Sequence, residues 1–193
     1  MKSSDILLPP PMLLAIAYAP VPVRARLKWL LMLDQRLADV LNRASEPMIA
    51  QLRLSWWRDA LNSTPDRRPK GEPLLMELND IKPDEAILVA GLSLVDACEV
   101  LATGTDLQER SDARKLRISA ICEAYRTWNG CADFGDSQID LIVNWWTNPA
   151  TPVPQSLPRL FRPLTILALA EKLETSQSQQ LPIRLNWHAL TGR

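Results

Sequence analysis

Residues 30–61 read LLMLDQRLADVLNRASEPMIAQLRLSWWRDAL and predict two helices that are joined at residues 42–47. At about 100° per residue, each helix gathers its apolar side chains on one side. One charge falls within each apolar arc, Asp34 in the first helix and Arg53 in the second. A buried charge is costly unless it is paired, so we predict that Asp34 and Arg53 meet between the two helices.

The rest of the chain continues the helical pattern and has no useful run of strand-like alternation, which predicts an all-α fold. The predicted helices span residues 12–19, 23–41, 48–61, 74–78, 84–102, 107–129, 136–148 and 163–173. Residues 84–102 are apolar nearly all round, which is typical of a central helix. We predict one domain over residues 1–193, with a proline-rich loop at 149–158 and a loosely docked tail at 174–193.

Composition excludes several classes of function. The chain has 22 basic and 22 acidic residues and no basic run interleaved with aromatic residues, so we expect no nucleic-acid partner. His188 has no cysteine or histidine at ligand spacing, which argues against a zinc site or a His-based triad. Cys98, Cys122 and Cys131 have no paired spacing, so we expect reduced thiols.

No segment reaches the length of an apolar membrane-spanning helix in this interpretation. We therefore expect a cytoplasmic protein with no transmembrane segment, whose contact with a membrane is at most peripheral, at the inner membrane. The charges are unevenly distributed, because basic residues prevail in residues 1–70 and acidic residues in 72–112. This pattern suits internal pairing, or binding of a diphosphate or an acidic partner by the first half.

The segment SEPMIAQLRLSWWRDAL, preceded by LDQRLADV, resembles the N-terminal part of the squalene/phytoene synthase family. It is similar to a divergent bacterial branch of this family and to complex I assembly factors built on the same scaffold. The resemblance extends more weakly through residues 94–101 and 157–167. It implies a shortened, all-helical isoprenoid-synthase fold. Working members of the family join two allylic diphosphates head to head and hold Mg²⁺ on two Asp-x-x-x-Asp clusters.

The first of these clusters is broken in this chain. Carboxylates four residues apart lie about 40° apart on a helix and can share a metal ion. Here Ala38 follows Asp34 at that spacing, and Asp39 is rotated about 140° away. Asp34 and Arg53 are then either the remnant of a diphosphate pocket, with Arg53 as a phosphate fork, or an internal ion pair. We favour the ion pair.

Asp136 and Asp140 have the spacing of the second cluster and open a predicted helix. They either hold Mg²⁺ or cap free N–H groups in the first helical turn, and we favour capping.

Asp96 and Glu99 lie on the polar strip of the central helix. They either line a pocket, or form an ordinary solvated stripe or pair with Arg114 and Arg117, and we favour the latter two over the pocket.

Two tryptophan pairs, Trp56–Trp57 and Trp145–Trp146, place neighbouring rings about 100° apart on a helix. In each pair we expect one ring in the core and the other against a neighbouring element or at a rim. An exposed ring would suit a partner protein or a membrane interface.

These observations predict a protein without catalytic residues or a cofactor, which binds a protein partner or an isoprenoid-like lipid. The alternative is an active or residual prenyltransferase that condenses allylic isoprenoid diphosphates with Mg²⁺.

Overall fold

The computed structural model of the chain describes residues 8–104, 106–130, 136–148, 151, 154 and 157–175, with the side chains of residues 136, 137, 174 and 175 left out. Every regular element in these residues is a helix, which confirms the all-α prediction. The α-helices are α1 (Pro10–Tyr18), α2 (Arg24–Arg43), α3 (Pro47–Asn62), α4 (Pro73–Asp80), α5 (Glu85–Thr103), α6 (Leu107–Trp128), α7 (Asp136–Thr147) and α8 (Arg162–Thr175). Short 3-10 turns are η1 (Val21–Val23), η2 (Pro65–Arg67) and η3 (Arg159–Phe161).

The helix ends follow from local chemistry. Proline occupies the first turn of α1, α3 and α4, where its missing N–H removes no hydrogen bond. The Asp84 carboxylate accepts from the Ile87 N–H at 3.0 Å and begins α5. Asp106 accepts from the Gln108 N–H at 3.1 Å and begins α6. Gly130, with φ of 63°, follows the end of α6 in the left-handed region that glycine adopts at little cost.

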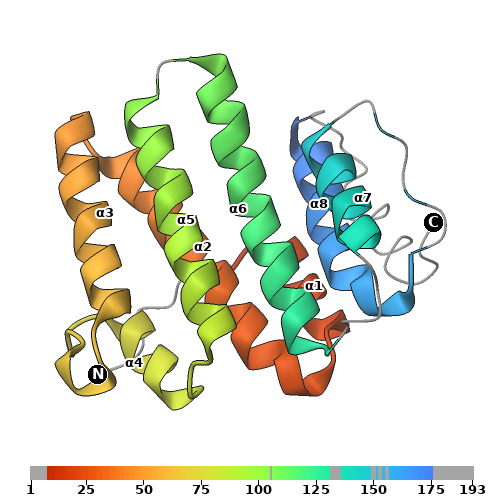
Figure 1. The fold of residues 1–193 in the computed structure, drawn as a ribbon, viewed down its shortest axis with the longest axis horizontal. Coiled ribbons are helices and arrows are strands. Elements are labelled where there is room, and N and C mark those ends of the chain that lie inside the picture. The colour runs from red at the N-terminus through yellow and green to blue at the C-terminus, as the bar shows by residue number, and fades with distance from the viewer. Residues whose placement is uncertain are drawn as a thin grey trace.

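Helix α5 lies at the centre of the bundle, as its apolar composition predicts. It packs against α2, α3 and α6. Figure 1 shows α3 on one flank of the bundle, and α7 with α8 on the other. Helix α1 packs against both α2 and α8, so the two ends of the described chain meet. One hydrophobic core extends from Leu8 to Leu173.

Helix α5 also corrects an expectation about membrane segments. Judged only by length and composition, Glu85–Thr103 could span a membrane, and it is the one such helix in the described part of the chain. A central helix of a soluble bundle meets the same criterion, and α5 packs against three neighbours. By length and composition alone, the expectation that no segment is long and apolar enough to span a membrane is wrong for α5.

Ion pairs between the basic first half and the acidic middle support one of the two predicted uses of the uneven charge. Within the described residues the pairs are Arg26–Asp84 at 3.4 Å, Lys28–Glu77 at 3.1 Å, Arg36–Glu72 at 3.0 Å, Arg58–Asp96 at 2.6 Å and Arg58–Glu99 at 2.6 Å. Asp96 and Glu99 thus pair with Arg58 of α3. Of the alternatives considered, pairing with Arg114 and Arg117 of α6 is wrong, because the polar strip of α5 faces α3 at these positions.

The first tryptophan pair divides between core and rim, and in the second pair Trp146 reaches the neighbouring α8, both as predicted. Trp57 is buried while Trp56 is 41% exposed, and their rings meet edge to face with centroids 5.2 Å apart. Trp145 and Trp146 are both buried, because α7 packs against α6 and α8.

Cys98 and Cys122 are free thiols in the core. Burial raises the pKa of Cys98 to about 12, so this thiol is a poor nucleophile at neutral pH. Cys131 and His188 lie outside the described residues.

Gly91 lies where α5 approaches both α2 and α3. A Cβ atom at this position would lie 3.3 Å from Leu33 Cδ2, and 3.5 Å from both Leu61 Cδ1 and Trp29 Cη2. Glycine inside a helix costs up to about 1 kcal/mol relative to alanine. Close packing of three helices therefore explains a residue that helix propensity alone disfavours.

Replacing Gly91 by Leu should lower the free energy of unfolding by about 3 kcal/mol, because the added side chain has no room between the helices. Val89→Leu adds volume at an exposed position of the same helix and should change it by less than about 0.5 kcal/mol. Urea denaturation measures both variants. Similar values for the two would contradict the close approach.

Candidate functional site

Asp34 is buried as predicted, with an exposed fraction of 3%. Its partner is Arg117 of α6, whose Nε donates to Oδ1 at 2.5 Å and whose Nη2 donates to Oδ2 at 2.6 Å. A guanidinium that binds a carboxylate through two parallel hydrogen bonds is among the strongest ion-pair geometries. Both oxygens of the Asp34 carboxylate are therefore engaged inside the protein.

The predicted pair between Asp34 and Arg53 is wrong. Arg53 is exposed and has no ion-pair partner among the residues that the structure describes. Helix α3 lies on the flank of the bundle, so it buries only a narrow strip, which comprises Ala50, Leu54, Trp57, Ala60 and Leu61. The apolar arc around Arg53 is broad in the sequence, but the fold leaves much of that arc uncovered.

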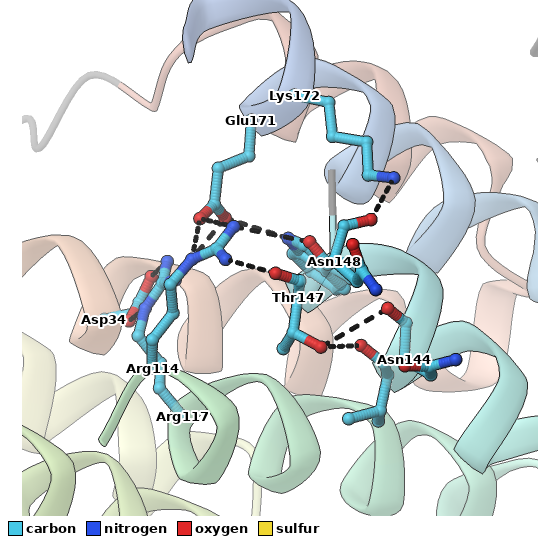
Figure 2. A network of polar contacts seen from close by, with 10 residues as sticks. Asp34, Arg114, Arg117, Asn144, Thr147, Asn148, Glu171 and Lys172 are labelled. Carbon is cyan, nitrogen blue, oxygen red and sulfur yellow. Dashed lines mark hydrogen bonds and ion pairs between the residues drawn. The ribbon is translucent and has the colours of Figure 1, made fainter. Parts of the chain in front are cut away.

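Asp34 belongs to a larger cluster, the α2–α6–α8 network, formed by Asp34, Arg114, Arg117 and Glu171. Arg117 Nη1 lies 3.6 Å from Glu171 Oε2, and Arg114 Nη2 lies 2.8 Å from Glu171 Oε1. Trp146 Nε1 also donates to Glu171 Oε2 at 2.9 Å. Figure 2 shows Asp34, the two arginines and Glu171 converging from α2, α6 and α8. The two arginines balance the two carboxylates, so the network is neutral.

Arg114 also binds the C-terminal end of α7. It donates to the backbone oxygens of Thr147 at 3.0 Å and Trp146 at 3.3 Å. Lys172 donates to the backbone oxygen of Asn148 at 2.9 Å, also visible in Figure 2. The last carbonyls of a helix lack partners within it and carry partial negative charge, so cations stabilise them. The network thereby fixes where α7 ends against α6 and α8.

The contacts within the network shift the pKa values of two of its side chains, Glu171 and Arg117. Burial raises the pKa of Glu171. The combined lowering by Arg117, the Trp146 N–H and Arg114 is larger, so the pKa lies below its ordinary value. The Asp34 carboxylate is the main reason that the pKa of Arg117 is raised. Glu171 and Arg117 are therefore both charged at neutral pH.

A cavity of about 300 Å³ adjoins the network. Its polar lining comes from Gln35, Arg117 and Glu171. The rest of the lining is apolar and consists of Pro9, Pro11, Met12, Leu31, Ile121, Trp146, Leu167 and Ala170. The volume is at the lower end of the range for small-molecule pockets. The walls suit an apolar ligand, whereas Arg117 is already paired with two carboxylates.

The second predicted acid pair lies on α7. Asp136 begins this helix, and Asp140 follows one turn later at an exposed position. The side chain of Asp136 lies outside the described residues, so a magnesium role for the two remains a prediction. On α2, Asp39 instead lies 3.5 Å from Arg43. The described residues contain no group of three or more His, Cys, Asp or Glu placed to hold a metal ion.

Glu171 is the site residue that sequence reasoning missed, and Arg117 was considered only as a partner for other acids. Glu171 is the one acid in the predicted helix of residues 163–173, and such an isolated charge needs a partner. Arg114 and Arg117 are three residues apart, which places them on one face of a helix. These signals identify charges that need partners, but they do not reveal which helices face one another.

Comparison with known proteins identifies no relative. No protein-family model matches the chain, and neither a curated protein nor a solved structure matches it. The resemblance to squalene/phytoene synthases therefore remains a prediction from the quoted motifs.

Replacing Arg117 by Met should lower the free energy of unfolding by about 3 kcal/mol, because the buried Asp34 carboxylate loses its counter-charge. Arg53→Met is the matched control, and it should change the value by less than about 0.5 kcal/mol because Arg53 is exposed. Urea denaturation at neutral pH compares them. A larger loss for the Arg53 variant would favour the pairing first predicted.

Glu171 predicts a specific pH dependence. Its pKa is lower in the folded than in the unfolded chain, so it stabilises the fold above its ordinary pKa of 4.5, and this contribution is lost as the pH falls through the folded value. Glu171→Gln should therefore lose less unfolding free energy than the parent between about pH 5 and pH 3. Glu109→Gln, at an exposed position, is the control. Identical slopes for Glu171→Gln and the parent would contradict the assignment.

Proposed function

We propose that the protein is a non-catalytic relative of the squalene/phytoene synthases, and that it acts by binding a protein partner or an isoprenoid-like lipid. The observation that carries this proposal is the bidentate contact between Arg117 and Asp34. Asp34 stands where the family resemblance expects the first magnesium-binding acid. In this chain that acid is neutralised by an arginine of the protein itself.

A diphosphate-ionising site needs carboxylates that are free to hold Mg²⁺ and cations that are free to neutralise the leaving group. On α2 the position one turn after Asp34 is Ala38, and Asp39 pairs with Arg43. Arg117, the cation nearest to Asp34, is shared between Asp34 and Glu171. The residues of α2 therefore do not fit a magnesium clamp, and no catalytic step is assigned to them.

The cavity beside the network supports the lipid as a ligand. Eight of its lining residues are apolar, and its charged groups satisfy each other. An uncharged isoprenoid chain would gain burial in such a space without needing a phosphate-binding group. The exposed apolar side chains of α3 support a protein partner. A cytoplasmic location remains part of the proposal.

One observation favours the alternative, a residual prenyltransferase. Asp136 and Asp140 do lie four residues apart on a helix, at the start of α7, and this helix packs against α6 and α8. Carboxylates with this spacing can share a metal ion. The alternative requires that this one pair hold Mg²⁺ without a matching pair on α2.

Incubation of the full chain with farnesyl or geranylgeranyl diphosphate and Mg²⁺ distinguishes the non-catalytic binding protein from the residual prenyltransferase. We expect no diphosphate release above the rate in buffer, because α2 lacks a free metal clamp. Release is measured by a coupled phosphate assay, with Asp136→Ala and Asp140→Ala prepared in parallel. Release that either variant abolishes would overturn the non-catalytic proposal and establish the transferase.

A further inference from the structure

The outer face of α3 carries a stripe of exposed apolar side chains. Met48, Leu52 and Trp56 are 65%, 64% and 41% exposed. Their spacing of four residues places them on one side of the helix, along about 12 Å of its axis. Single exposed apolar residues are common on protein surfaces, but an aligned set of this size is typical of a binding surface.

The stripe borders a groove of about 530 Å³ between α2 and α3. Leu52 and Trp56 belong to both the stripe and the groove lining, and Val40 and the buried Trp57 extend the apolar lining. The surface is therefore hollowed beside the stripe. Side chains of a docked helix can enter such a groove, as in other complexes of a helix with a hydrophobic cleft.

The charges of the groove determine what fits it. Three arginines line it, Arg36, Arg43 and Arg53, against two acids. The acids are already paired, Glu72 with Arg36 at 3.0 Å and Asp39 with Arg43 at 3.5 Å. Arg53 has no ion-pair partner in the described part of the chain. The groove therefore has a net positive charge and one available cation beside its apolar wall.

We propose that the α2–α3 groove docks an amphipathic helix of a partner protein. The partner places apolar side chains on Met48, Leu52 and Trp56 and a carboxylate on Arg53. This inference rests on the proposed function, since it names the partner of a binding protein. Charge complementarity favours this occupant over a second copy of the chain, whose groove has the same sign of charge. A flat bilayer would contact the stripe but leave the groove unfilled.

The test uses a synthetic helical peptide of about 18 residues with leucines along one face and glutamates beside them, together with a matched peptide that has lysine at each glutamate. The full chain should bind the glutamate peptide at least about tenfold more tightly than the lysine peptide. Leu52→Asp should weaken this binding about tenfold or more. Leu107→Asp, at an exposed leucine of α6, should bind as the parent does. Arg53→Glu should reverse the preference in favour of the lysine peptide.

Equal binding of the two peptides, or no binding, would overturn the inference. A dimer in sedimentation velocity that Leu52→Asp dissociates would assign the groove to a second copy instead. Binding to phosphatidylglycerol vesicles that Leu52→Asp abolishes would assign it to a membrane. Failure of the proposed function is detected separately. It would appear as diphosphate release by the parent chain, whether or not the peptides bind.

Discussion

The Asp34 carboxylate on α2 is held by Arg117 of α6, and this contact constrains how the bundle closes. A carboxylate removed from water must be compensated nearby, which fixes the position and orientation of α6 relative to α2. Arg117 then brings in Glu171, and with it α8. Arg114 shares Glu171 and binds the end of α7. A single charge on the inner face of α2 is thereby connected to the arrangement of three later helices.

Because this contact occupies the charges of the interior, the charges available to a partner lie at the surface. Catalytic sites keep charged groups available for the substrate, whereas the α2–α6–α8 network is internally neutral. The apolar cavity beside it has room for an uncharged chain, but its arginine is engaged. Among the arginines that line the groove on the flank, Arg53 has no ion-pair partner in the described residues, and it lies beside an exposed apolar stripe. In our proposal, a neutral interior network and an unpaired cation in a surface groove together suit a binding protein.

Much of the fold was predictable because each helix has a recognisable pattern within its own residues. The helical pattern of apolar residues predicted all eight α-helices that the structure describes, and the composition of α5 predicted its central place. Asp34 was predictable as a buried charge for the same reason. Its partner was not, because periodicity states which side of a helix is apolar but not which helix covers that side. Arg53 shows this limit, since α3 lies on the flank and leaves Leu52 and Trp56 of the same apolar arc exposed.

The central claim is that Asp34 is committed to the protein itself and not to a metal ion. A crystal structure of the full chain grown with Mg²⁺ and a non-hydrolysable farnesyl diphosphate analogue tests this most directly. We predict that both Asp34 oxygens still accept from Arg117 and that no divalent ion lies on α2. An ordered Mg²⁺ bridging the Asp34 carboxylate and the diphosphate, with Arg117 turned away, would contradict it.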